Sequence, residues 1–303
     1  MTSGIVLGPN DHDLRVAFEP GLGMVGYSLE HRGEELLGQR GGLAAYRDRG
    51  STFGIPLLHP WANRLSGVEY EADGRAVELS PERSPVRLDG NGLPIHGLLA
   101  ACPYWQVVDR GADEDRTGLV ARLDFGAHPE LLAAFPFPHE LDLEVELAAD
   151  TLTVSTVLRP TADAAVPVAF GWHPYLVLPG VPRADWHVEL PVLARALLDE
   201  RGLPTGAVEP VAIEPGPLGQ RSYDDLFPEL AEPSVFALEG GGRRIEVEFG
   251  EGYPVAQVFA PPEEEHICFE PMTAPTNALV SGERLRFAAP DESFRATFRI
   301  RVR

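Results

Sequence analysis

Lysine is absent from this sequence of 303 residues, and all 25 of its lysine-or-arginine positions are arginine. A lysine amine is needed by enzymes that form a Schiff base with their substrate or with pyridoxal phosphate. It is also needed by the phosphate-binding loop of nucleotide hydrolases. The absence of lysine therefore excludes these three kinds of site.

Cysteine and long apolar runs are also scarce. Cys102 and Cys268 are the only cysteines and lie far apart, which predicts buried thiols in a reducing compartment rather than a disulfide framework. No run approaches the roughly 18 apolar residues of a transmembrane helix. The N-terminal residues have neither the basic start nor the apolar core of a signal peptide. We therefore expect a soluble, cytoplasmic protein without a membrane partner.

Positive charge is in deficit, with 46 acidic residues against 25 basic ones and a net charge of −21. This balance argues against nucleic acid and anionic membranes as partners, because both repel a strongly negative surface. It argues only weakly against a phosphorylated small molecule, which a local arginine cluster could still hold. Candidates for such a cluster are Arg40, Arg47, Arg83 and Arg87.

Apolar residues recur with the period of strands. Leucine or valine alternates with acids over residues 141–147, and apolar positions recur over residues 152–158 after a turn at 149–150. This is the pattern of a hairpin with one buried face. Residues 294–302 alternate in the same way, with arginine on the polar side, and residues 245–249 follow a glycine turn. Many short strands of this kind predict an all-β sandwich or barrel.

Helical spacing is rare, because 31 glycines and 29 prolines interrupt most windows of twelve residues. Residues 130–134 are compatible with one short turn or helix. Residues 201–217 are rich in proline and glycine, and we expect them to form a long ordered surface loop. Strand patterns continue on both sides of that loop, so we expect residues 1–303 to form one domain.

Three polar residues interrupt apolar stretches in a way that suggests acid–base chemistry. His173 precedes Pro174, and the proline biases it towards an extended backbone. His96 precedes Gly97, and Glu270 lies in the apolar stretch HICFEPM. A buried carboxylate is costly unless it is paired or functional, so Glu270 is the hardest to explain as structural. Taken alone, either histidine could be a core residue bonded to a carbonyl.

Weaker candidates have equally good structural explanations. Arg64, after Asn63, could be a structural ion pair, and Asp224 and Asp225 could form a solvated turn or a helix cap. The sequence contains no H-E-x-x-H, no zinc spacing of Cys and His, and no G-x-S-x-G. We therefore expect neither a metal nor another cofactor. The remaining histidines are interpreted as surface or structural residues: His12, His31, His59, His128, His139, His187 and His266.

In combination, these segments resemble the aldose 1-epimerase (galactose mutarotase) family. The resemblance rests on Asn63-Arg64, His96-Gly97, the Gly-x-His-Pro-Tyr segment at 171–175 and Glu270-Pro271, which occur in the family's order. It implies a large antiparallel β-sandwich that binds a sugar on its concave face. It also implies interconversion of the α and β anomers of a free hexose such as glucose or galactose.

The resemblance also implies roles for individual residues. His173 corresponds to the acid that protonates the ring oxygen, and Glu270 to the base that takes the proton from the anomeric hydroxyl. Substrate-binding roles fall on Arg64, His96, Asn63 and Asp224, with Asp225 as the alternative to Asp224. We expect the acid and the base to lie on either side of the anomeric centre, and nearby acids to favour the imidazolium form of His173.

Alternatives remain for the substrate and for the function. The substrate could be a hexose 6-phosphate, or the chain could be a non-catalytic sugar-binding module on the same fold. The expected partner is a small monosaccharide, and the expected assembly is a monomer or homodimer.

Overall fold

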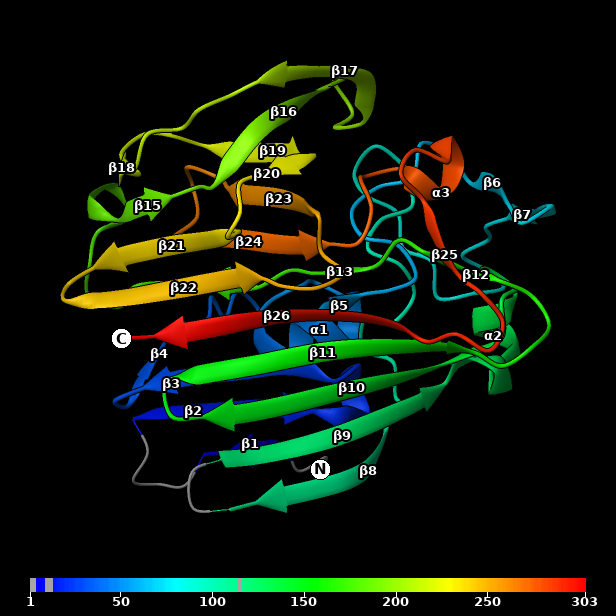
Figure 1. Cartoon of the computed structure of the whole chain (residues 1–303), viewed down its shortest axis with the longest axis horizontal. Coiled ribbons are helices and arrows are strands. Elements are labelled where there is room, and N and C mark those ends of the chain that lie inside the picture. The colour runs from blue at the N-terminus through cyan, green and yellow to red at the C-terminus, as the bar shows by residue number, and fades with distance from the viewer. Residues whose placement is uncertain (1–3, 9–12, 114–115) are drawn as a thin grey trace.

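The computed structural model describes residues 4–8, 13–113 and 116–303. In these residues nine strands form an antiparallel sheet in the order β18-β15-β21-β22-β26-β11-β10-β9-β8, which extends across Figure 1. The strands of this sheet are β8 (Gln106–Ala112), β9 (Arg116–Asp124), β10 (His139–Ala148), β11 (Thr151–Pro160), β15 (His187–Glu189), β18 (Gly216–Pro217), β21 (Val235–Gly240), β22 (Arg243–Phe249) and β26 (Phe294–Val302).

A second sheet carries most of the candidate residues. Its strands run in the order β19-β23-β24-β13-β5, and β14 also pairs with β24. Their bounds are β5 (Leu57–Leu58), β13 (Gly171–Trp172), β14 (Tyr175–Leu176), β19 (Tyr223–Phe227), β23 (Val255–Ala260) and β24 (Ile267–Met272). Every pairing in this sheet is antiparallel.

Smaller sheets and short helices complete the described part of the chain. One sheet has the order β1-β2-β3-β4 and another the order β17-β16-β20, and two pairs stand apart. These strands are β1 (Ile5–Leu7), β2 (Leu14–Glu19), β3 (Val25–His31), β4 (Glu34–Glu35), β6 (Glu69–Ala72), β7 (Arg75–Glu78), β12 (Val166–Val168), β16 (Val192–Leu198), β17 (Pro204–Pro210), β20 (Glu229–Leu230) and β25 (Arg286–Ala288). The helices are α1 (Gly42–Arg49), α2 (Pro129–Leu132) and α3 (Ala278–Ser281), with 3₁₀ turns at Pro20–Leu22, Phe125–Ala127 and Arg183–Asp185.

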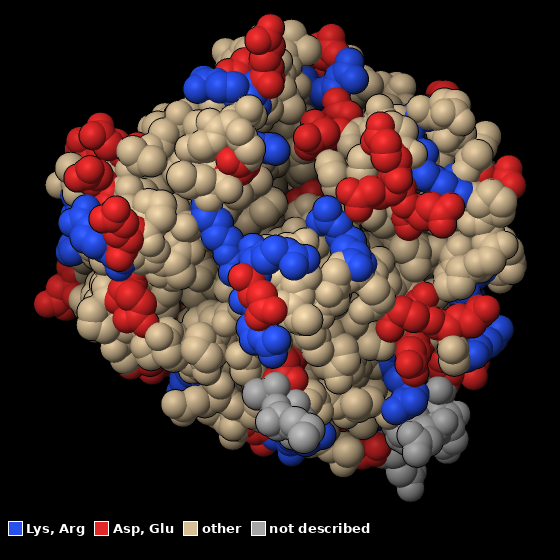
Figure 2. All heavy atoms as spheres, turned by 180° about the vertical axis from the view of Figure 1, so that it is seen from behind, with Lys and Arg blue, Asp and Glu red and all other residues tan. Residues whose placement is uncertain are grey.

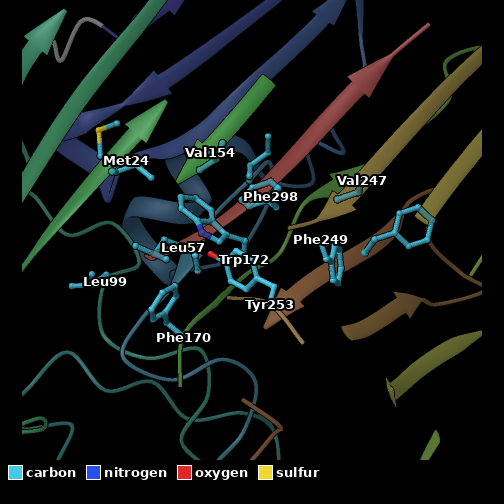
Figure 3. Packing of buried hydrophobic residues seen from close by; sticks show 14 of the residues in the cluster. Met24, Leu57, Leu99, Val154, Phe170, Trp172, Val247, Phe249, Tyr253 and Phe298 are labelled. Atoms are coloured by element: carbon cyan, nitrogen blue, oxygen red, sulfur yellow. The ribbon is translucent and has the colours of Figure 1, made fainter. Parts of the chain in front are cut away.

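Trp172 joins the two larger sheets through the core. Its ring lies 5.6 Å from that of Phe298 on β26, and its Nε1 donates to Thr156 Oγ1 on β11 at 3.2 Å. Figure 3 shows Trp172 among Phe170, Tyr253 and Phe298. Successive side chains of a strand alternate between faces. Burial of Trp172 on the core face therefore turns the next residue, His173, to the opposite face, where the candidate site lies.

The strands expected from alternation are present. β10 and β11 form the predicted hairpin with Leu147 opposite Leu152, and β26 buries Ala296, Phe298 and Ile300. The short helix expected near residue 130 is α2. The expected all-β antiparallel architecture is confirmed, and both cysteines are buried free thiols.

Two local predictions were wrong or incomplete. Residues 201–217 are not a loop throughout, because β17 and β18 form within them and β17 pairs with β16. The prolines at both ends of β17 fit an edge strand, where a missing N–H breaks few ladder bonds. Helix α1 was missed because it has only eight residues. It ends at Arg49, and the capping residue Gly50 adopts φ 65° and donates its N–H to the Tyr46 and Ala45 carbonyls.

Among the described residues, no helix has the length and apolar character that a membrane crossing requires.

A buried pair of histidines lies beneath the loop that leads to Arg64. His59 Nε2 and His139 Nε2 are 2.9 Å apart, and His139 Nδ1 lies 2.6 Å from the Phe137 carbonyl. The carbonyl can only accept, so we infer that His139 donates through Nδ1 and accepts from His59 through Nε2. Burial lowers the pKa of His139 to about 4 and that of His59 well below its usual value.

This pair predicts a loss of stability in mild acid. Between pH 6.5 and about 4 these histidines bind protons in the unfolded chain but not in the folded one. The free energy of unfolding therefore decreases as the pH is lowered through this range. Each such histidine contributes up to about 1.4 kcal/mol per pH unit. His139→Gln should lower stability at pH 7.5 and flatten the acid slope, measured by urea unfolding at several pH values. A variant slope equal to that of the wild type, or an equal flattening by the control His187→Gln on β15, would contradict this account.

Candidate active site

Strand register places His173 opposite Glu270. β24 pairs with β13 through Gly171 and Met272, and with β14 through Tyr175 and Cys268. Counting two residues inward from either pair leads to His173 on one side and Glu270 on the other. Directly opposed residues of antiparallel strands share a face of the sheet. His173 Nε2 and Glu270 Oε1 accordingly lie 3.2 Å apart, with side chains only 6% and 2% exposed.

The side chains of His173 and Glu270 are adjacent. The expectation that they lie on either side of the anomeric centre stays a prediction. Adjacent groups can serve the ring oxygen and the anomeric hydroxyl together, because both oxygens are bonded to the same carbon.

Burial determines where the shared proton resides. The pKa of Glu270 is raised well above its usual value by burial and by the charge of Asp224, against the opposing effect of Arg64. The pKa of His173 is lowered well below its usual value by burial, and further by His96, His266 and Arg40. The expected imidazolium at His173 is therefore wrong for the free protein. A neutral imidazole beside a protonated carboxyl avoids two buried charges.

His96 lies beside His173 on a constrained turn. The two rings are 5.5 Å apart and nearly perpendicular. His96 has φ 60°, and its backbone N–H donates to the Asn63 carbonyl at 2.9 Å. Gly97 follows with φ 66°, and a Cβ there would lie 2.2 Å from the His59 carbonyl oxygen, so only glycine fits. Burial and the charges of Arg64 and Arg87 lower the pKa of His96 to about 3.

Arg64 is held at the edge of this cluster by an acid and an amide. Its Nε donates to Asp89 Oδ2 at 2.8 Å, and one Nη donates to Asn63 Oδ1 at 3.2 Å. Asn63 itself has φ 54°, which is uncommon outside glycine and often found at functional sites. The side chain of Arg64 is 22% exposed, so it can meet both the buried groups and a ligand.

Register also distinguishes Asp224 from Asp225. The two lie on β19, and alternation points them to opposite faces. Asp224 accepts a 2.7 Å hydrogen bond from Gln257 Nε2, and Gln257 is the residue of β23 directly opposite Glu270. Asp225 instead pairs with Arg195 at 3.6 Å. Asp224, and not Asp225, therefore shares a face with Glu270. Both aspartates lie within a strand, so the turn or helix cap considered from the sequence is not formed.

Gln257 and Tyr175 belong to this cluster but were not among the predicted residues. Gln257 is a buried amide in the apolar strand VAQVFA, which is the same signal that pointed to Glu270. Tyr175 follows His173 by two residues, and its ring stacks on the imidazole at 4.3 Å. Residues two apart in an extended segment share a face, so the sequence could have indicated that Tyr175 lies beside His173.

Four residues of this cluster each have a buried polar atom without a hydrogen-bond partner among the described residues. These atoms are His96 Nδ1, His173 Nδ1, Gln257 Oε1 and Glu270 Oε2. A buried polar atom without a partner costs on the order of 1–3 kcal/mol, so native proteins rarely keep several together. Such a cluster is typical of a site that binds a hydroxyl-rich ligand. Figure 2 shows that the face seen from behind is hollowed above its centre, where acidic and basic side chains meet.

The other histidines lie apart from this cluster, except one. His266 packs its ring 5.0 Å from that of Tyr175, so it supports the cluster from behind. His128 stacks on Tyr104, and His59 and His139 form the core pair. His12 lies outside the described residues. No three His, Cys, Asp or Glu side chains of the described chain are grouped as metal ligands.

Comparison with solved structures supports the fold. The Slr1438 protein from Synechocystis sp. PCC 6803 is 23% identical, with a TM-score of 0.80 over 100% of this chain and 96% of that one. A galactose mutarotase-like protein from Clostridium acetobutylicum is 18% identical, with a TM-score of 0.82 over 96% and 93% of the two chains. The galactose 1-epimerase from Lactobacillus acidophilus NCFM is 16% identical, with a TM-score of 0.77 over 98% and 93%.

Sequence comparison gives the family. A match to YphB of Escherichia coli (strain K12) has 32% identity over 130 residues, which is 41% of this chain and 37% of that protein. The aligned part therefore spans little more than a third of the curated relative. The profile of the aldose 1-epimerase family, by contrast, matches residues 26–301. With a match over nearly its whole length, this chain belongs to the aldose 1-epimerase family.

Proposed function

We propose that this protein is an aldose 1-epimerase that interconverts the α and β anomers of a free hexose such as glucose or galactose. The observation that carries the proposal is the buried contact of 3.2 Å between His173 and Glu270. Around it lie unpartnered polar atoms suited to sugar hydroxyls. Membership of the family supports an isomerase acting on a sugar.

The reaction needs one proton removed and one delivered. Glu270 takes the proton of the anomeric hydroxyl while His173 gives a proton to the ring oxygen. The bond from C1 to the ring oxygen breaks and the carbonyl at C1 forms. Rotation about C1–C2 then lets the ring close on the other face, with both protons returned. Each proton transfer contributes about 10²–10⁴-fold to the rate.

The protonation that burial favours corresponds to one stage of this cycle. An imidazolium beside a carboxylate carries the same number of protons as an imidazole beside a carboxylic acid. The ion-pair form is the reactant for ring opening, and the neutral form is what opening leaves behind. Burial favours the neutral form in the free protein. Sugar hydroxyls that form hydrogen bonds with the charged groups would lower the free energy of the ion-pair form relative to the neutral form.

The remaining predicted residues bind the sugar. Arg64 and Asn63 offer donors and an amide at one edge, and Asp224 offers acceptors at the other. His96 stays neutral because burial disfavours its charged form, so it can donate from one nitrogen and accept at the other.

The four arginines considered for a phosphate all make polar contacts within the protein. Arg40 pairs with Glu264, Arg47 with Asp48, and Arg83 lies 3.9 Å from Glu78. Arg87 donates to the carbonyls of Gly50 and Ala100. These contacts favour the neutral sugar over its 6-phosphate.

Removal of either member of the acid–base pair should abolish most of the acceleration. His173→Ala and Glu270→Gln should each slow mutarotation of freshly dissolved α-D-glucose or α-D-galactose by at least about 10²-fold, followed by polarimetry. The double variant should be little slower than the worse single one, because the two groups act as a unit. His187→Ala and Glu248→Gln, both away from the site, serve as matched controls. Wild-type rates in both site variants would refute the assignment, and sugar binding without any acceleration would indicate a binding module.

Asp224 and Asp225 provide an internal comparison. Asp224→Asn should raise KM for the hexose, because it weakens an acceptor on the face of Glu270. Asp225→Asn should leave KM near the wild-type value, since Asp225 lies on the other face. The two KM values from initial-rate polarimetry test the strand register directly. The opposite order would exchange the two roles.

The preferred substrate follows from the engaged arginines. We expect kcat/KM for glucose to exceed that for glucose 6-phosphate when both are measured at the same ionic strength. A higher value for the phosphate would instead favour a hexose-6-phosphate 1-epimerase.

A further inference from the structure

Tyr175 occupies a defined position behind the acid–base pair. It lies on β14, two residues after His173, and is paired with Cys268 on β24. Two residues further along β24 is Glu270. Residues two apart on a strand share a face, so the side chains of Tyr175, His173 and Glu270 meet on one side of the sheet. Tyr175 is fully buried there.

The tyrosine ring contacts the imidazole face to face. The two rings are 4.3 Å apart and inclined by only 3°. The phenol oxygen is 3.4 Å from His173 Nε2, but with parallel rings it lies over the face of the imidazole. A nitrogen of imidazole donates or accepts in the plane of its ring. The tyrosine therefore restricts the ring by stacking, and Glu270 Oε1 lies 3.2 Å from the same Nε2.

The hydroxyl of Tyr175 is held by two further side chains. It lies 2.6 Å from Thr52 Oγ1 and accepts from Arg40 Nη1 at 3.4 Å. The arginine can only donate, whereas either hydroxyl can be the donor in the contact with Thr52. Arg40 also donates to the Thr52 carbonyl and is itself held by Glu264. The phenol is thus anchored at its far end.

We propose that Tyr175, anchored by Thr52 and Arg40, is a positioning residue that holds the imidazole of His173 against the carboxyl group of Glu270. This inference rests on the proposed function for its kinetic meaning, but the geometry it assigns to His173 can be tested without any activity. Titratable and charged groups face His173 from every surrounding element: Glu270 and Cys268 of β24, Tyr175 of β14, His96, His266, and Arg40 with Glu264.

Three variants separate the anchor from the stack. Tyr175→Phe and Thr52→Val each remove one end of the 2.6 Å contact and keep the stacked ring. Each should lower kcat roughly fivefold, the scale of one net hydrogen bond, with KM little changed. The double variant should be no slower than the worse single one. Tyr175→Leu also removes the stack and should lower kcat by about 10²-fold, because a misplaced catalytic group costs that much.

The control and the second readout keep the test independent of overall stability. Tyr70→Phe removes another buried hydroxyl, which donates to the Ala134 carbonyl, and should leave kcat unchanged. NMR titration of the His173 imidazole in the full chain should show its pKa rising towards the usual value in Tyr175→Leu, as the ring becomes less buried. If the wild type shows no mutarotation but the titration shifts, the inference stands and the proposed function fails. Unchanged kcat and unchanged titration in the Tyr175 variants, with only a lower melting temperature, would overturn the inference.

Discussion

The candidate site depends on one constraint, the register between β24 and the segment that contains β13 and β14. Pairing at Gly171 with Met272 and at Tyr175 with Cys268 leaves no freedom for the residues between them. A slip of one residue would turn every side chain of β24 to the other face. Trp172 opposes such a slip, because its indole is locked between the sheets and bonded to Thr156. Core packing on the opposite face therefore fixes the geometry of the candidate site.

The site gathers buried polar atoms without a partner, which also occur elsewhere in the described residues, as at Tyr46 and Trp105. Elsewhere, polar residues of the large sheet are paired across strands, as Arg295 is with Glu144 and Arg299 with Glu248. In the site, an acid and several imidazoles are buried with atoms left unpartnered. Natural proteins tolerate such local conflicts mainly where function requires them. The two shifts of pKa, upwards for Glu270 and downwards for His173, are consequences of the same burial.

Sequence patterns predicted the site better than they predicted its electrostatics. His173, His96, Glu270 and Arg64 stood out because each interrupts an apolar stretch, and these side chains occupy one region. Gln257 carries the same signal and could have been included. The charge state of His173 was predicted wrongly, because the loss of water on burial lowers its pKa more than nearby acids can raise it. The extent to which a side chain is buried depends on tertiary packing, so it cannot be read from the neighbouring residues in the sequence.

The sequence by itself determined the features that depend on neighbours along the chain. Alternation specified β10, β11 and β26, and the lack of lysine removed whole classes of chemistry, because both are local or compositional properties. Tertiary structure alone decided which residues meet. The contact of His173 with Glu270, the preference for Asp224 over Asp225 and the stacked Tyr175 all follow from pairing between distant strands. That pairing is selected by burial of the whole apolar surface at once, so it appears only when the chain is folded.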